Sequence, residues 1–333
     1  MTGEGDAGPG LGAVPSARYI PPILQAAVRL RPAPATAGGG PPRRAGLIGP
    51  DAMTEPMSLE GKEADRRKAS QEGGLGETVK VVVQALLIAL VVRTFLFQPF
   101  NIPSGSLIPT LLVGDYLFVS KYAYGYSKYS FPDVSGTVAD LLHVPKPPDY
   151  RDVIHGRILA TPPKRGDIAV FKFPLDNSTD YIKRVIGLPG DRIQLVHARL
   201  IINGQMAPRE PIQNVTTTDQ FGNQVEVPTY NETLPGGVTH RIIQRDGDDG
   251  SIYSNTPVYV VPPNDYFMMG DNRDNSTDSR VAPEQGGVGY VPFENFVGRA
   301  ELIFFSIRED TPIWQFWRWP TDVRWNRLFT LVR

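Results

Sequence analysis

Hydrophobic residues are concentrated in one window of the chain. This window, Val79–Phe97, reads VKVVVQALLIALVVRTFLF and carries Val, Leu and Ile on every side of a helix. A helix of this length extends for about 28 Å, close to the hydrocarbon thickness of a bilayer. Lys80 and Arg93 lie near its two ends, where long side chains can reach the headgroups. A helix buried in a soluble protein usually has one apolar stripe, so we predict a transmembrane helix at residues 77–98.

The segments on either side of this window predict an orientation. Residues 1–76 are rich in Gly, Pro, Ala and charge, which predicts a disordered tail. Within it, Met53 opens a second possible start, and we hypothesise that residues 1–52 are an artefact of start-codon choice. Lys and Arg are in excess at Lys62–Lys68, and none follows the window until Lys121. The positive-inside rule then places the tail in the cytoplasm and everything after residue 98 outside.

Beyond the window the pattern is mainly that of β-strands. Short Val, Ile, Tyr and Phe runs are separated by Gly, Pro, Asn and Asp, and Asn203-Gly204 marks a hairpin. The runs are Tyr116–Tyr124, Ile168–Phe173, Tyr181–Ile186, Val258–Val261 and Ala300–Phe305. No long amphipathic helix interrupts them. We therefore predict a mainly β domain of antiparallel sheets at residues 99–308, with polar insertions at 126–163 and 205–256 and a Trp-rich extension at 309–333.

Composition excludes several kinds of chemistry. The 333 residues include no Cys, which rules out disulfides, thiolate metal sites and Cys nucleophiles. The four His residues show no close metal-ligand spacing, so we expect no metal and no cofactor. A net charge of −1 gives no electrostatic basis for binding nucleic acid.

Two segments combine candidate nucleophiles with a candidate base. In Asn101–Asp115, Ser104 and Ser106 flank a Gly, which permits a tight turn that exposes a hydroxyl and aims backbone N–H groups at an oxyanion. Such a string is more often an ordinary turn. In Asp180–Asp191, Lys183 and Arg184 alternate along a predicted strand, so we expect one of them to face inward. A buried Lys has a lowered pKa and can act as a base, whereas an ordinary strand Lys is solvated.

A third segment, Gly270–Arg280, is unusually polar. It reads GDNRDNSTDSR and follows the apolar run Tyr266–Met269. It predicts either a solvated loop or a hydrogen-bonded network that positions a site. A calcium loop would need a different spacing of acidic residues, so we discount that interpretation.

These segments together resemble bacterial type I signal peptidases, the family with a Ser–Lys dyad. The matching motifs follow the apolar helix in order. They are IPSGSLIPTLLVGD (Ile102–Asp115), KRGDIAVFKFP (Lys164–Pro174), DYIKRVIGLPGD (Asp180–Asp191) and FMMGDNRDNSTDSR (Phe267–Arg280). The resemblance extends from the helix to Ser306. Leu107 departs from the pattern, since Met usually follows the Ser, but the two residues have similar volumes.

The resemblance implies a role for each matched residue. Ser106 would be the nucleophile and Lys183 the general base, with the Ser104 hydroxyl and the Ser106 N–H as the oxyanion hole. Ser276 would hydrogen-bond and orient Lys183. Asp278 and Arg280 would pair to shape the site, with Asp271 and Arg273 holding the loop. Apolar pockets favouring Ala at the first and third positions before the cut would be lined by Phe100, Ile102, Leu111, Tyr181 and Ile182. A Lys in place of the His of a Ser–His–Asp triad suits this sequence, which has no His near these motifs.

The implied protein is a serine endopeptidase of the bacterial inner membrane. It would cross the membrane once, hold its catalytic domain in the periplasm, and cleave signal peptides from exported preproteins. Two alternatives stay open: another Ser–Lys peptidase such as a self-cleaving repressor, or a membrane-tethered, non-catalytic β module that binds exported proteins. The four Trp residues of the extension fit either the membrane interface or packing on the β domain.

Overall fold

One exposed apolar helix precedes the β domain in the computed structural model, which describes residues 76–145, 147–218 and 223–333. The predicted tail, apart from Gly76, and the second start at Met53 lie outside these residues. The helix spans Gly76–Leu96, and by length and composition it can cross a membrane; only 6% of its apolar window is buried. Its last five residues form a π-helical turn, η2 (Val92–Leu96), that leads directly into the first strand.

The largest sheet has an open, antiparallel strand order, β1-β2-β14-β3-β4-β12-β13, with β15 pairing to β14. Its strands are β1 (Phe97–Asn101), β2 (Asp115–Ser120), β3 (Ile168–Lys172), β4 (Asp180–Gly187), β12 (Asp265–Met269), β13 (Val291–Pro292), β14 (Phe296–Ser306) and β15 (Thr330–Leu331). The 3-10 turn η3 (Gly105–Leu107) lies between β1 and β2. The predicted mainly antiparallel β domain after one apolar helix is therefore confirmed.

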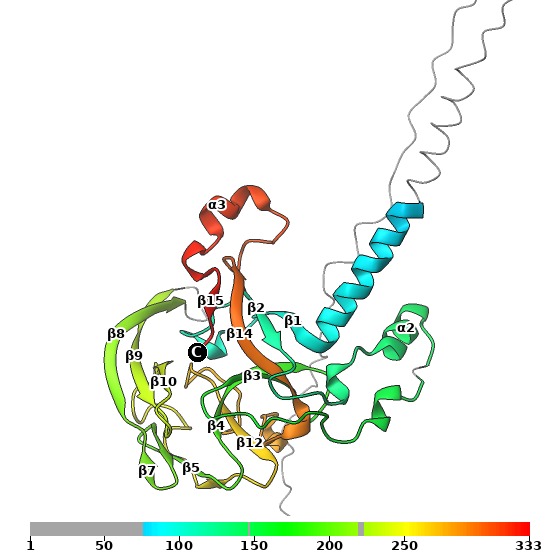
Figure 1. The fold of residues 1–333 in the computed structure, drawn as a ribbon. Coiled ribbons are helices and arrows are strands. Elements are labelled where there is room, and N and C mark those ends of the chain that lie inside the picture. Colours follow the sequence, from blue (N-terminus) through cyan, green and yellow to red (C-terminus); the bar gives the residue numbers. More distant parts are fainter. Residues whose placement is uncertain (1–75, 146, 219–222) are drawn as a thin grey trace, which may run out of the picture. The chain divides into compact units, whose positions relative to one another are not determined.

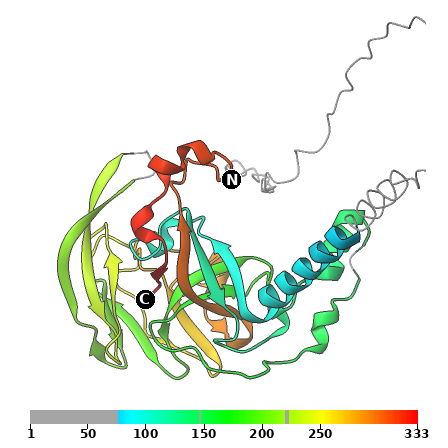
Figure 2. The ribbon, with the colours of Figure 1, turned by 45° about the horizontal axis from the view of Figure 1, so that its top comes forward.

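Two smaller antiparallel sheets complete the domain, with strand orders β10-β9-β8 and β11-β5-β6-β7. Their strands are β5 (Arg192–Val196), β6 (Arg199–Ile202), β7 (Gln205–Met206), β8 (Arg209–Thr218), β9 (Gln224–Thr233), β10 (Thr239–Ile243) and β11 (Tyr259–Val260). In Figures 1 and 2, β8 and β9 form a long curved ribbon at one side of the domain. The stretch 205–256, expected as a weakly patterned insertion, thus contains regular strands. Their polar, Thr-rich sequence did not indicate strands. The sequence is polar because β9 is buried on one face only, so its other face carries polar residues.

The other expected insertion, 126–163, contains a short helix that the sequence did not predict. Its elements are η4 (Lys128–Ser130), α2 (Val134–Leu142) and η5 (Tyr150–Val153). The Asp133 carboxylate accepts from the Gly136 N–H at 2.8 Å and caps the first turn of α2. Because α2 has only 9 residues and is flanked by Pro, its apolar period is too short to read from sequence.

The C-terminal extension folds back onto the largest sheet. Besides β15, it contains η8 (Phe316–Arg318), α3 (Trp319–Asp322) and η9 (Trp325–Arg327), and η6 (Pro283–Gln285) and η7 (Phe293–Asn295) precede β14. The Arg327 guanidinium pairs with the buried Asp115 carboxylate of β2. The four Trp residues differ in how far they are covered. The Trp319 ring packs at 5.2 Å from Phe305, whereas Trp314, Trp317 and Trp325 are exposed.

We expect Gly298→Ala to destabilise the domain because β14 and β2 approach closely there. A Cβ at Gly298 would lie 2.4 Å from the Ser120 carbonyl oxygen and 2.8 Å from Val119 Cγ1. Since one contact is with backbone, the strands must shift, which we expect to lower the free energy of unfolding by about 1–3 kcal/mol. Thermal or denaturant unfolding of the variant measures this. An unchanged midpoint would show that the strands separate there without strain.

Candidate active site

Ser106 and Lys183 meet in a buried contact between two distant segments. Ser106 lies on η3, and Lys183 lies in the middle of β4. The Lys183 Nζ is 2.7 Å from the Ser106 Oγ and 3.2 Å from the Ile182 carbonyl oxygen. The two residues are only 7% and 4% exposed. A hydroxyl and an amine in direct contact, shielded from water, have the geometry of a nucleophile and its base.

The surroundings of Lys183 favour its uncharged form. Burial, together with the nearby Arg280 charge, lowers the pKa of the amine from 10.5 to about 8, while the carboxylates of Asp278 and Asp271 oppose this change. Removing an ammonium group from water disfavours the protonated state, which is why burial has the largest effect. A substantial fraction of the amine is therefore able to accept a proton in mildly alkaline solution.

The loop after β12 holds the Ser106 turn through its backbone. The Asn272 N–H donates to the Ser106 carbonyl at 3.0 Å, and the Asn272 side-chain amide donates to the Gly105 carbonyl at 3.1 Å. Gly270 permits this close approach, since a Cβ there would lie 2.5 Å from the Ser106 carbonyl oxygen and 2.3 Å from Ser276 Oγ. The sequence analysis did not identify Asn272. In the sequence, only its position within the polar motif Gly270–Arg280 could have marked Asn272 as a site residue.

The remaining two Ser residues, Ser104 and Ser276, line the same cleft as Ser106 and Lys183. Ser104 is exposed and has an extended backbone, with φ −130° and ψ 150°, and its side chain does not cap η3. Ser276 Oγ is buried and has no hydrogen-bond partner among the described residues. The expected bond from Ser276 to Lys183 is thus not formed. The Ser276 side chain instead lies next to Gly270, while the amine contacts Ser106 and Ile182.

Asp278 and Arg280 form a fully buried, bidentate pair. Arg280 Nε and Nη2 donate to the two Asp278 oxygens at 2.9 and 2.8 Å. Arg280 also donates to the Arg273 carbonyl at 2.6 Å, and the Gly270 N–H donates to Asp278 at 3.0 Å. Burial alone would raise the pKa of Asp278, but the Arg280 charge and these hydrogen bonds outweigh it and lower the pKa. The pair therefore stays ionised and closes the loop upon itself.

Asp271 and Arg273 anchor the loop to two other strands rather than to each other. Asp271 receives two bonds from Arg184 of β4, at 2.8 and 2.7 Å, and one from the Thr110 hydroxyl. Arg273 pairs with Glu232 of β9. The sequence analysis expected only one of Lys183 and Arg184 to face inward. Both are buried. Lys183 contacts Ser106 on one side of β4, and Arg184 binds Asp271 on the other.

A histidine also belongs to this network, which corrects the expectation that none lies near the motifs. His240 Nε2 is 3.6 Å from Glu232 and 3.9 Å from Asp271. Burial and the Arg184 charge lower its pKa to about 4, so the ring is neutral near pH 7. His240 lies on β10, far in sequence from every motif, and only the fold brings it there.

Two cavities adjoin the dyad. The larger, about 670 Å³, is lined by Ser104, Ser106, Lys183 and Ser276 and also by Tyr253 and Asp274. The smaller, about 190 Å³, is lined by Phe100, Ile102, Tyr181 and Ile182, four of the five residues expected in a pocket. Leu111 is the exception. It is fully buried within the apolar core beneath, packed with Ile102 and Leu107, and lines neither cavity.

Comparison with known proteins agrees with the motifs. The family model "Signal peptidase, peptidase S26" matches residues 75–305. Signal peptidase I of Rickettsia typhi (strain ATCC VR-144 / Wilmington) is 41% identical over 227 residues, which cover 67% of this chain and 77% of that protein. Signal peptidase I of Rickettsia akari (strain Hartford) is 37% identical over 262 residues, which cover 73% and 88%. The chain belongs to the signal peptidase family, peptidase S26.

Proposed function

We propose that this chain is a type I signal peptidase that cleaves N-terminal signal peptides from exported preproteins, with Ser106 as nucleophile and Lys183 as general base. Membership of the family supports a signal-peptide-cleaving serine endopeptidase. The observation that carries the dyad is the 2.7 Å contact between Lys183 Nζ and Ser106 Oγ. A neutral amine at this distance can remove the hydroxyl proton as the oxygen attacks a carbonyl.

The reaction follows from this contact. Ser106 Oγ attacks the scissile carbonyl carbon while Lys183 accepts its proton, and a tetrahedral oxyanion forms. The protonated amine then donates to the leaving nitrogen, which releases the mature protein and leaves an acyl-enzyme. Water deprotonated by Lys183 hydrolyses the ester and restores the dyad. The Ser106 N–H and the Ser104 hydroxyl, which lines the same cleft, would donate to the oxyanion.

Specificity would come from the smaller cavity beside the dyad. Its walls are Phe100 and Ile102 at the end of β1 and Tyr181 and Ile182 of β4. These apolar walls suit an uncharged, apolar side chain. The motifs shared with type I signal peptidases imply Ala at the first and third positions before the cut, so we propose cleavage after Ala-x-Ala sites, with the cavity receiving one of the two Ala residues.

The apolar helix would anchor the enzyme in the bacterial inner membrane. The Lys and Arg residues before it and their absence just after it support a cytoplasmic N-terminus and a periplasmic catalytic domain. Of the two alternatives, the non-catalytic module is disfavoured by the dyad itself. Burying a Lys beside a Ser hydroxyl opposes folding and has no use in a protein that only binds. A self-cleaving repressor is disfavoured by the membrane-length helix directly before β1.

Ser106→Ala and Lys183→Ala should each abolish cleavage of a preprotein with an Ala-x-Ala site. The first removes the attacking oxygen and the second its base, so we expect a loss of at least about 10³-fold in kcat/KM. Gel-based cleavage of a purified preprotein measures this, with circular dichroism to confirm folding. Lys164→Ala, an exposed Lys outside both cavities, is the matched control and should stay active. Near-normal activity in either dyad variant would refute the assignment.

The pH dependence of kcat/KM should report the Lys183 amine. Only its neutral form can act as base, and its pKa is lowered to about 8. Activity should therefore rise about tenfold per pH unit below that value and level off above it. Initial rates with one peptide substrate between pH 5 and 10 give the profile. A plateau that extends down to pH 6 would show that a different base is used.

Gly270→Ala should inactivate the enzyme through the Ser106 turn. The new Cβ would overlap the Ser106 carbonyl oxygen and the Ser276 side chain, so the loop after β12 must move away from η3. We expect at least about a 100-fold loss of kcat, since small displacements of reacting groups have effects of this size. Gly190→Ala, which meets no atom within 4 Å but has a positive φ of 87°, tests whether a Gly replacement elsewhere has the same effect. Full activity of Gly270→Ala would show that the loop after β12 accepts a Cβ at position 270 without displacing the Ser106 turn.

A further inference from the structure

The insert, residues 126–163, exposes an unusual number of large apolar side chains. Six of them are between 51% and 79% exposed: Leu141, Leu142, Val144, Val153, Ile158 and Leu159. Single exposed apolar residues are ordinary on soluble domains, but a group of this size within one short segment indicates a contact surface. None of these residues lines either cavity beside the dyad.

The base of the insert is firmly held by the catalytic domain. Tyr126 and Ile158 exchange backbone hydrogen bonds of 2.9 and 2.8 Å, which close the segment at its root. The Arg157 guanidinium donates to the carbonyls of Tyr124 and Gly125 on one side and to those of Phe293, Glu294 and Phe296 on the other. The exposed apolar residues are therefore presented from a fixed base.

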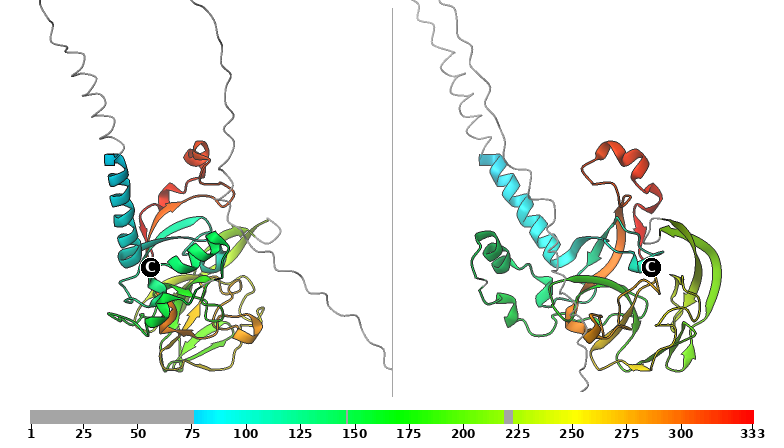
Figure 3. Two further views of the ribbon diagram at one scale, coloured as in Figure 1. Left: turned by 90° about the vertical axis from the view of Figure 1, so that its right-hand side faces the viewer. Right: turned by 180° about the vertical axis from the view of Figure 1, so that it is seen from behind.

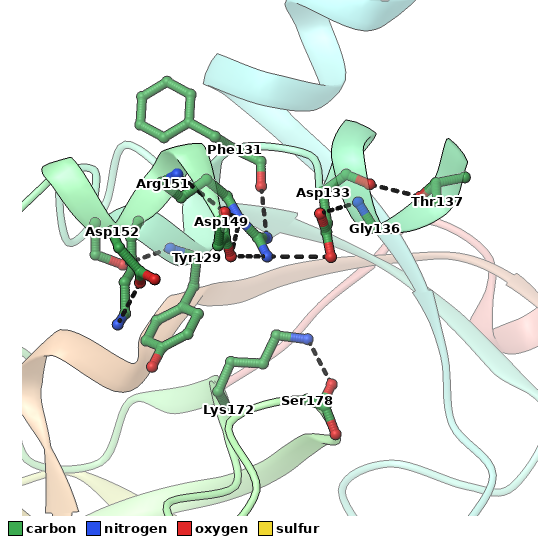
Figure 4. A network of polar contacts seen from close by, with 12 residues as sticks. Tyr129, Phe131, Asp133, Gly136, Thr137, Asp149, Arg151, Asp152, Lys172 and Ser178 are labelled. Atoms are coloured by element: carbon green, nitrogen blue, oxygen red, sulfur yellow. Dashed lines mark hydrogen bonds and ion pairs between the residues drawn. The ribbon is translucent and has the colours of Figure 1, made fainter. Parts of the chain in front are cut away.

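The polar groups of the insert are largely bonded to one another (Figure 4). Arg151 donates to both oxygens of Asp149 at 2.6–2.9 Å and contacts Asp133 at 3.3 Å, and Asp133 caps α2. Lys128 pairs with Asp152 at 3.4 Å. With these groups bonded internally, the insert presents Leu141, Leu142 and Val144 at the C-terminal end of α2 and just beyond it.

The insert is attached at the end of the apolar helix. The Phe95 ring lies 5.7 Å from the Tyr126 ring and 6.1 Å from the Phe131 ring, and the Tyr126 hydroxyl donates to the Phe95 carbonyl at 2.8 Å. The Lys121 N–H donates to the Leu96 carbonyl at 3.0 Å. In Figures 1 and 3, α2 lies beside this end of the helix. If the helix crosses the bilayer, the insert lies at the surface of that membrane on the side of the catalytic domain, where lipid meets water.

We propose that the exposed apolar residues of the insert bind the lipid bilayer, forming a second membrane contact beside the spanning helix. The proposal rests on the membrane orientation given under the proposed function, but not on the dyad. Continuity with the helix end identifies phospholipid as the occupant, because any surface fixed there meets acyl chains and headgroups first. Leu141, Leu142 and Val144 enter the headgroup region, as the apolar side of an interfacial helix does. The insert thereby limits rotation of the catalytic domain about the helix.

The absence of Cys makes a direct test simple. Leu141→Cys and Leu142→Cys, each in the full-length chain, would be labelled with an environment-sensitive fluorophore and reconstituted in phosphatidylcholine vesicles. Met206→Cys in β7 is the matched control: it is also apolar and 51% exposed, and β7 lies away from the helix end in Figure 1. Quenching by nitroxide-labelled lipid should be at least about threefold stronger at the insert than at the control, and iodide quenching correspondingly weaker.

A second pair of variants separates lipid contact from protein packing. In a Val144→Cys background, Leu141→Glu should abolish lipid quenching, because a carboxylate resists entry into the interface, whereas Leu141→Ile should retain it. Free access of iodide to all insert probes would overturn the proposal. So would protection from both quenchers, which would indicate a protein contact instead. If lipid quenching is absent but the same labelled samples still cleave a preprotein, only the proposal about the insert is wrong. If preprotein cleavage is absent as well, the proposed function is also contradicted.

Discussion

The contact between the Lys183 amine and the Ser106 hydroxyl is the interaction on which the proposed chemistry depends. It requires partial exclusion of water, since burial is what lowers the pKa of the amine far enough for a useful fraction of it to be uncharged. Lys183 achieves this from the middle of a central strand, with Ser106 across the contact and the loop after β12 around it. Burial has a limit, however. Two nearby carboxylates, Asp278 and Asp271, keep the pKa near 8 rather than lower, so the amine stays basic enough to accept a proton.

The charges around the dyad are balanced by pairing rather than by solvent. Asp278 binds Arg280, Asp271 binds Arg184, and Arg273 binds Glu232, all within the domain interior. Each pair joins the loop after β12 to itself, to β4 or to β9. Buried pairs of this kind add little net stability, but loss of one partner leaves an uncompensated charge. Their value lies in geometry: they fix the loop whose Asn272 holds the Ser106 turn.

Sequence reasoning predicted the helix and the β class from local pattern, and the short motifs of the family led it to propose Ser106 and Lys183 as partners, which the structure brings into contact. It could not predict contacts made by distant strands. His240 and Glu232 lie in a stretch whose polar composition resembled a loop, and only the pairing of β9 and β10 brings them to Asp271. Leu111 and Ile102 belong to one motif and look equivalent in sequence, and both pack in the same core, yet only Ile102 also lines the cavity. The direction of a side chain in an irregular segment is set by packing, not by period.

The connection between helix and site keeps Ser106 close to the end of the apolar helix. Leu96 ends the helix and Ser106 lies ten residues later (106 − 96), with β1 between them. Even fully extended, ten residues span no more than about 36 Å, so the nucleophile must stay within that distance of the helix end. If the helix spans the membrane, as proposed, a signal peptide held in the bilayer presents its cleavage site within the same narrow zone. A free catalytic domain would have to find that zone by diffusion, whereas β1 carries Ser106 there and, by pairing with β2, fixes its orientation to the sheet. The short link therefore explains how one strand can both connect the apolar helix to the domain and form one wall of the cavity beside the dyad.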